Sequence, residues 1–475
     1  MHEPNKYISK DHKFSRYPCT DTGNMERYIN QHQGYLRSLG SSKNWITWDG
    51  IRWRPVGYSE AFNFALNTCS LIKNEAANAS TIEDAQLLNS WAKTSQGEHK
   101  IKSMLNMAAN NNTMLASIND FDKEPSELNC LNGIVNLKTG ELRERSSEDK
   151  NTKLVNVSYS KDSQCPHFKK FVEEVFNHDK DLIKWVQRAI GYSLTGSVQE
   201  QVLFICYGTG ANGKSTLLKT IARILGDYST NTDFEVFLSN QKSDVRIMEA
   251  VGELKGIRIA LASEVDASRR FNESLIKRLT GGDTLRGTKL HSGSFLFAPQ
   301  HKLWFLTNHL PFAKDGSHGF WRRIRVIPFN QRFEKSSLDS SLPEKLWAER
   351  EGILRWIIEG AVRWYKELNR TEGTTGLGFC RAVDDSLKQY RYDNDYCSRF
   401  IDECLREGKP EDKIGARDLF HAYQNWNFNN DNDDSTPENI FSRRMEERGF
   451  KKTRANQGIV YLGVVLDEQY STPTF

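Results

Sequence analysis

The strongest chemical signal in the sequence is one continuous run: Gly208, Thr209, Gly210, Ala211, Asn212, Gly213, Lys214, Ser215 and Thr216. Glycines let backbone N–H groups approach phosphate oxygens, a lysine offers a cation to the β- and γ-phosphates, and a serine hydroxyl can bind Mg²⁺. The apolar stretch 202–207 predicts a buried strand before the run, and 216–225 predicts a helix after it. The helix N-terminus then faces the bound anion. We therefore expect a phosphate-binding loop that binds ATP with Mg²⁺ and uses Lys214 in catalysis.

Two later predicted strands end in side chains that suit the same chemistry. The stretch 256–261 leads to Glu264 and Asp266. Carboxylates at this place can bind the Mg²⁺ and polarise the attacking water. The stretch 302–307 ends at Asn308, a polar side chain suited to sensing the γ-phosphate. We expect Glu264 and Asn308 to be catalytic residues, with Ser215, Glu264 and Asp266 as the metal ligands.

A pair of arginines precedes the next apolar stretch, 324–329. Arg322 and Arg323 should be held at the edge of the domain, where a guanidinium can reach the γ-phosphate of a neighbouring subunit. A structural salt bridge is the ordinary explanation for one of the two. Both are candidate catalytic residues, and the sequence leaves open which one acts.

Basic residues at two places are candidates for DNA contacts. A hairpin predicted over 284–298 carries the first group, Arg286, Lys289 and His291, and resembles the Lys/His-bearing hairpin that precedes the sensor strand in superfamily 3 helicases. Near the C-terminus, three predicted helices and a closing hairpin give the layout of a winged helix, with 441–448 as its recognition helix. The second group lies there and consists of Arg443, Arg444, Lys451 and Lys452, with Arg454 beside them. An ordinary surface histidine at 291 and a protein–protein role for the winged helix stay open as alternatives.

Taken together, these motifs resemble superfamily 3 helicases of the phage and plasmid D5-like (P4 alpha-like) primase–helicase family. The segments 20–27, 45–53 and 131–140 resemble the parts of the family that precede the ATPase core, and 352–361 resembles the helical part after it. The resemblance implies an AAA+-type ring, usually hexameric, that hydrolyses ATP between subunits and translocates along DNA. Two departures from the family pattern stand out. Val265 separates the acids Glu264 and Asp266, and Thr288 stands where a basic residue is expected.

Composition limits the classes of protein that remain. The 475 residues suggest about three domains. A net charge of only +4 means that any affinity for nucleic acid must come from local clusters rather than from a general basic field. Eight cysteines without C-x-x-C spacing disfavour a zinc site, and no apolar run is long enough to cross a bilayer. We expect a cytoplasmic protein of a prokaryotic host cell, without a membrane segment.

The predicted fold class is α/β. An AAA+-type core with a parallel sheet and flanking helices follows a mainly helical N-terminal domain and precedes a C-terminal winged helix. The predicted divisions are a segment with a tryptophan hairpin (1–55), a helical D5-N-like domain (56–165), the ATPase core with a helical collar (166–335), a helical segment and linker (336–395) and the winged helix (396–475). Trp45, Trp48 and Trp53 are expected to pin the hairpin rather than to stack on bases.

The expected function is an ATP-dependent, ring-forming DNA helicase of a phage, plasmid or mobile element, acting in replication. Its partners would be single-stranded or forked DNA, further copies of itself in a homo-hexamer, and a separate primase or other replication proteins. The alternative is a DNA-binding ATPase that does not unwind, such as an initiator or defence assembly. The residues before the core offer no acidic triad or zinc ribbon for primer synthesis, so no primase activity is expected from this chain.

Overall fold

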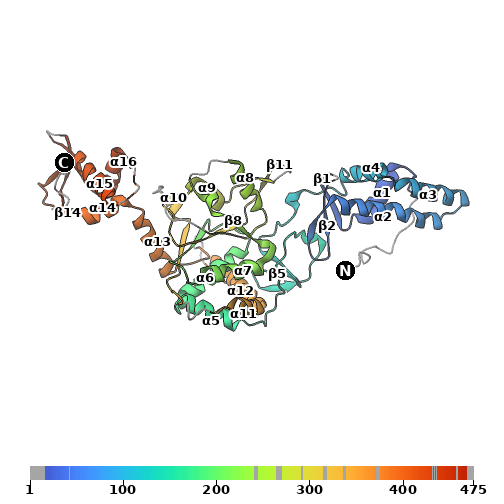
Figure 1. Cartoon of the computed structure of the whole chain (residues 1–475), viewed down its shortest axis with the longest axis horizontal. Helices are drawn as coiled ribbons and strands as arrows, with labels where there is room; N and C mark the ends of the chain where they lie inside the picture. Colours follow the sequence, from blue (N-terminus) through green and yellow to red (C-terminus); the bar gives the residue numbers. More distant parts are fainter. Residues whose placement is uncertain are drawn as a thin grey trace.

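The computed structural model describes residues 17–41, 43–239, 244–263, 270–289, 293–313, 318–334, 339–370, 375–430, 432, 434, 436–455 and 458–467. The chain is elongated, with an N-terminal unit (17–121) and a C-terminal unit (396–467) at opposite ends of a central core (166–393), as Figure 1 shows. Separate clusters of buried apolar side chains fill the two end units, and two large clusters fill the core. Among the described helices, none has the length and apolar character that crossing a membrane requires.

The N-terminal unit packs four helices against a small antiparallel sheet. These elements are α1 (Asp21–His32), α2 (Tyr58–Ala77), α3 (Ile82–Ser95), α4 (Glu98–Ala109), β1 (Leu36–Ser41), β2 (Asn44–Trp48) and β3 (Trp53–Val56). The helical spacing predicted after residue 59 is confirmed, and so is the tryptophan hairpin, in which Trp48 pairs with Trp53. Because Trp45 and Trp53 are buried, packing accounts for them.

Helix α1 has no counterpart in the predictions, because its buried face is largely polar. Asn24, Arg27 and His32 are all buried. The Arg27 guanidinium lies 2.7 Å from Glu75 of α2, and the Asn24 amide donates to the Ser95 hydroxyl at 2.9 Å. A helix that buries paired polar groups lacks the apolar stripe on which sequence prediction depends.

Between this unit and the core lies a second antiparallel sheet, made of β4 (Glu127–Cys130), β5 (Gly133–Asn136) and β6 (Glu141–Arg143). The residues 129–159 alternate and turn at 132–133 and 139–140, which predicts short strands, and this sheet confirms them. Short 3-10 turns occur at η1 (Ile118–Asp120), η2 (Ser147–Asp149), η3 (Gly226–Tyr228) and η4 (Phe234–Phe237).

A five-stranded parallel sheet forms the centre of the core. Its strands are β7 (Leu203–Tyr207), β8 (Ser229–Asp233), β9 (Ile259–Ser263), β12 (Lys302–Thr307) and β13 (Ile324–Pro328), in the spatial order β13-β7-β12-β9-β8. Because all five run in the same direction, their carboxyl ends meet at one edge. Ligands of open parallel sheets bind at this edge, where the strand order changes direction.

Helices cover both sides of the sheet. They are α5 (Pro166–Val175), α6 (Lys180–Leu194), α7 (Lys214–Leu225), α8 (Asp244–Glu253), α9 (Glu273–Thr280), α10 (His318–Trp321), α11 (Leu342–Ala348), α12 (Arg350–Leu368) and α13 (Arg381–Asp393). The apolar spacing over 166–195 predicts one long helical stretch, but the structure has two helices there, α5 and α6, because the backbone turns left-handed at Asn177 and His178.

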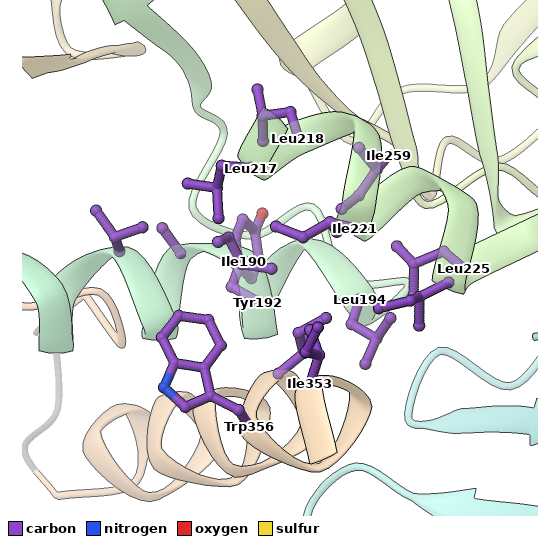
Figure 2. Close-up of a cluster of buried hydrophobic side chains, with 14 of the residues drawn as sticks. Ile190, Tyr192, Leu194, Leu217, Leu218, Ile221, Leu225, Ile259, Ile353 and Trp356 are labelled. Atoms are coloured by element: carbon purple, nitrogen blue, oxygen red, sulfur yellow. The ribbon is translucent and has the colours of Figure 1, made fainter. Parts of the chain in front are cut away.

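Helix α6 packs between α7 and α12, as Figure 2 shows. Ile190 and Leu194 of α6 meet Ile221 of α7 on one side and Ile353 of α12 on the other in this cluster. The helices α6 and α12 cross closely at Gly191, where an added Cβ would lie 2.1 Å from the Ala361 nitrogen. This helical layer holds α7, and with it the loop that precedes α7, against the sheet.

A hairpin of β10 (Leu285–Lys289) and β11 (Gly293–Phe297) confirms the one predicted here. It packs against α8 through two facing glycines, since a Cβ on Gly287 would lie 2.4 Å from the Gly252 Cα. The Thr288 backbone takes part in the same contact, since a Cβ on Gly252 would lie 2.2 Å from the Thr288 carbonyl oxygen, and the Thr288 hydroxyl is buried.

The C-terminal unit contains α14 (Tyr396–Cys404), β14 (Leu405–Glu407), β15 (Lys413–Gly415), α15 (Ala416–Asn429), α16 (Glu438–Glu447), β16 (Lys452–Ala455), β17 (Gly458–Leu462) and β18 (Val464–Leu466). The strands β15, β17 and β16 form one antiparallel sheet, and β14 pairs with β18. The apolar stretch 459–466 predicts a single closing strand, but it is divided at Gly463, whose φ of 69° interrupts the extended backbone. Helix α13, which precedes the unit and packs against β13, was absent from the predictions.

Candidate nucleotide site

The glycine-rich loop leaves β7 and enters α7 at the carboxyl edge of the sheet. Gly210, Ala211 and Gly213 adopt positive φ angles of 98°, 49° and 83°, which glycine tolerates best. Gly208 lies so close to the chain after β13 that an added Cβ would be 2.4 Å from the Phe329 oxygen. The first N–H groups of α7 have no acceptor within the helix, so the loop and the helix start present donors to an anion.

Lys214 reaches across this edge to a residue that lies 94 positions away. Its ammonium donates to the Gly208 carbonyl and, at 3.1 Å, to the Asn308 side-chain oxygen. Only 5% of Lys214 is exposed, and this burial lowers the pKa of its amine. Asn308 follows β12, the strand between β7 and β9. The structure thus brings together two of the predicted site residues, while Ser215 lies exposed at the start of α7.

The segment after β13 braces the loop, a contact that the motif alone does not indicate. The Asn212 side chain donates to the Phe329 carbonyl at 3.2 Å, and the Phe333 N–H donates to the Ala211 carbonyl at 2.8 Å. Asn212 is buried, whereas Thr209 and Ala211 are exposed. The amide of Asn212 in the middle of the glycine-rich loop was the sequence signal available for this brace.

The strand predicted to precede the catalytic acid is present, since β9 ends at Ser263 and pairs there with Leu306 of β12. The predicted residues Glu264, Asp266 and His291 lie outside the described residues.

Arg322 and Arg323 lie at the amino edge of the sheet, opposite the loop. Ile324, the first residue of β13, pairs with Leu203, the first residue of β7. The pair is therefore about six strand residues, or roughly 20 Å, from the Gly208 end of the same sheet. Neither guanidinium can reach the phosphate site of its own chain.

The two arginines have different surroundings. Arg323 donates to the Thr280 hydroxyl at 3.1 Å and to the Gly319 carbonyl, and it is partly buried. Arg322 is exposed and donates to the Gln201 side-chain oxygen at 2.6 Å. Gln201 has a left-handed backbone with φ of 51°, and its role was missed by the sequence reasoning because nothing in its neighbourhood marks it. Burial lowers the pKa of Arg323.

Of the predicted basic residues of the hairpin, the structure describes the side chain of Arg286 and the backbone of Lys289. Arg286 is exposed and donates to the Ser294 hydroxyl of the paired strand at 3.1 Å. The backbone of Lys289 pairs with Gly293 as the last described pair of the hairpin.

The basic residues of the C-terminal unit do not share one surface environment. Arg443 lies 3.6 Å from Glu447, and Lys452 pairs with Glu446. Arg444 donates to the Thr436 hydroxyl at 3.3 Å and lines a pocket beside α13. Lys451 is exposed. Carboxylates thus neutralise part of the group that the sequence reasoning treated as a single basic patch.

Comparisons with known proteins give two family models and several viral relatives for this chain. The family model described as "D5 N terminal like" matches residues 24–177, and a model of a family of unknown function matches 206–323. A protein of Acanthamoeba polyphaga mimivirus, named "Putative helicase", is 25% identical over 431 residues, covering 82% of this chain and 44% of the relative. One of African swine fever virus, named "Putative primase", is 21% identical over 254 residues, covering 51% and 26%.

The chain spans less than half the length of these curated relatives. Among solved structures, the apo NrS-1 C-terminal region is similar with a TM-score of 0.50 at 12% identity, covering 93% of this chain and 99% of that one. This likeness supports the same α/β fold with its five-stranded parallel sheet. The match to the N-terminal model and the viral relatives, joined to the motifs above, support a D5-like primase–helicase family for this chain.

Proposed function

We propose that this chain is the ATP-hydrolysing motor of a superfamily 3 DNA helicase that acts in the replication of viral or other mobile DNA. The observation that carries the proposal is the contact of Lys214 with Asn308 at the mouth of the glycine-rich loop. A buried cation and a polar side chain from the neighbouring strand converge where the γ-phosphate of a bound nucleotide would lie. The viral relatives named as helicases and primases support a role in replication.

In the proposed site, the N–H groups of the loop and of α7 bind the phosphates, and Lys214 neutralises charge on the outer ones. The donor set of the Ser215 hydroxyl with the carboxylates of Glu264 and Asp266 suits Mg²⁺, which prefers oxygen ligands. Bound Mg²⁺ would neutralise charge that develops on the phosphates. Glu264 would accept a proton from the attacking water, and Asn308 would orient that water beside the γ-phosphate.

The position of the arginine pair supports a site shared between subunits. Since Arg322 and Arg323 lie at the amino edge, they can complete a nucleotide site only in a neighbouring copy. We assign the finger to Arg322, because it is exposed, and a structural role to Arg323, because Thr280 and Gly319 hold it in place. This arrangement fits an AAA+-type ring, with a homo-hexamer as the expected assembly.

DNA would run through the centre of this ring. One β10–β11 hairpin from each subunit would bring Arg286, Lys289 and His291 to the phosphates of the strand. The order of helices and strands in the C-terminal unit, with β15 added to the β16–β17 hairpin, supports a winged helix. A primase supplied by another part of the replication machinery would act beside the ring.

Unwinding of a forked duplex by the purified protein tests the proposal. We expect ATP-dependent strand separation by the wild-type chain and none by Lys214→Ala, which removes the cation from the phosphate site. Melting temperatures of the two proteins control for folding. Hydrolysis stimulated by DNA but without strand separation would favour the non-unwinding ATPase instead, and absence of hydrolysis would contradict the motor itself.

A further inference from the structure

A pocket of about 400 Å³ lies where the C-terminal unit meets the core. Helices α13, α14 and α16 provide most of its wall, and Ala313 and Trp321 contribute from the core. The Ala313 N–H donates to the Asn394 side chain at 2.8 Å, and the ring of Trp321 packs edge-on against Tyr390 at 5.1 Å. These two contacts join the end of α13 to the core side of the pocket. Ala313 follows the sensor residue Asn308 by only five positions.

The pocket wall is rich in cations. Lys388, Arg391, Arg444 and Arg448 line it, against the two carboxylates of Asp395 and Glu447, which leaves a formal excess of two positive charges (four minus two). Both carboxylates already have basic partners. Asp395 pairs with Arg448, and Glu447 lies 3.6 Å from Arg443, which is outside the pocket.

Among the described residues, two of the four cations that line the pocket are paired with carboxylates, and the other two are not. Lys388 lies 2.7 Å from Asp384, and Arg448 is held by Asp395. Arg391 instead lies over the Trp321 ring at 5.8 Å, and Arg444 donates only to the Thr436 hydroxyl. Within the described part of the chain, neither Arg391 nor Arg444 has a carboxylate partner. Guanidinium groups without a carboxylate partner match the geometry and charge of a phosphate.

We propose that this pocket binds the phosphate backbone of single-stranded DNA. The inference rests on the proposed function, since it assumes that the motor acts on DNA. Tyr392, which is 39% exposed, offers a ring on which a base can stack. Beyond Arg448 the chain continues to the exposed cations Lys451 and Arg454. The strand would thus contact the side of α16 where Arg444 and Arg448 line the pocket.

The double variant Arg391→Gln/Arg444→Gln tests this pocket. Its matched control is Arg381→Gln/Arg406→Gln, which removes the same charge from α13 and the C-terminal unit at exposed arginines paired with Asp385 and Asp467. Fluorescence anisotropy with labelled oligo-dT at several salt concentrations gives the affinity and its salt dependence. For the pocket variant we expect about tenfold weaker binding and a salt slope smaller by about 1.4, because each phosphate contact on a single strand contributes about 0.7. The control should bind like wild type.

The outcomes distinguish failure of the pocket proposal from failure of the proposed function on which it rests. Binding by the pocket variant equal to that of the control, with wild type binding normally, would overturn the pocket and leave the helicase proposal in place. No binding of oligo-dT by wild type would overturn the DNA part of the proposed function, and the pocket with it. Loss of thymidine monophosphate binding with unchanged oligo-dT binding would assign the pocket to a free nucleotide.

A conservative variant guards against loss of folding. If the glutamine variant melts at a lower temperature than wild type, Arg391→Lys/Arg444→Lys keeps both charges and should recover most of the affinity for oligo-dT. A folded lysine variant that binds as weakly as the glutamine variant would contradict an electrostatic role for the pocket.

Discussion

Replacing Arg322 and Arg323 one at a time separates a catalytic from a structural arginine. A finger that stabilises the phosphoryl-transfer transition state contributes about 10³- to 10⁵-fold to kcat. At 1.36 kcal/mol per decade, Arg322→Ala should raise the barrier by about 4–7 kcal/mol. Its only polar side-chain partner among the described residues is Gln201, so the melting temperature should change little.

Arg323→Ala should behave in the opposite way. It removes the hydrogen bonds to Thr280 and Gly319, which are worth about 1.5–3 kcal/mol each when the donor is charged. The melting temperature should fall by several degrees, at about 2–4 °C per kcal/mol for a domain of this size. Hydrolysis by the folded fraction should drop much less than in Arg322→Ala.

Mixing the inactive variants tests whether the site is shared. In an equal mixture of Arg322→Ala and Lys214→Ala, each interface draws its two halves at random, so about a quarter of the interfaces join an intact loop to an intact finger. We expect steady-state hydrolysis to recover toward that fraction of the wild-type rate. Absence of recovery at every mixing ratio, with subunit exchange verified by energy transfer between labelled subunits, would refute the argument from the amino edge.

Three further predictions concern the sensor, the helical layer and a buried histidine. Asn308→Ala should lower turnover by about 10²- to 10³-fold, as loss of one oriented polar group does, while a fluorescent ATP analogue still binds. Gly191→Ala should destabilise the fold by about 1–3 kcal/mol in denaturant unfolding because its Cβ would overlap Ala361, whereas Gly34→Ala, which has open space, should not. Burial, with Lys302 beside it, lowers the pKa of His301 to about 3. His301 is therefore neutral when folded and takes up a proton on unfolding below about pH 6.5, so stability should fall as the pH drops toward 3 by up to about 1.4 kcal/mol per pH unit, and His301→Phe should flatten that slope in melting curves.

The core strands β7, β9, β12 and β13 were predictable because each is a short, mostly apolar run, whereas β8 is polar and was not predicted. The spatial order of the strands was not predictable, since the sequences of β7, β9 and β12 do not indicate which strands pair with each other. The insertion of β12 between β7 and β9 is what brings Asn308 to Lys214. Helix α1 was not predicted because its buried face is largely polar. The docking of the hairpin was not predictable either, because the contact of Gly252 with Gly287 produces no apolar pattern in the sequence.

For the candidate site, the phosphate loop was predictable because its residues are contiguous. Which of Arg322 and Arg323 acts as the finger was not predictable. The assignment depends on their contacts with Gln201 and Thr280, which are far away in sequence. The pairing of Arg443 with Glu447 had a readable signal, since residues four apart on a helix are neighbours. The pocket beside α13 could not be inferred, because α13 itself was not predicted.

The most direct test of the account is an image of the purified protein with a non-hydrolysable ATP analogue and forked DNA. We predict a ring in which the triphosphate lies between the loop of one subunit, at Lys214, and Arg322 of its neighbour, with one DNA strand in the central channel against the β10–β11 hairpins. A nucleotide bound entirely within one isolated chain, or DNA lying outside the ring, would contradict it.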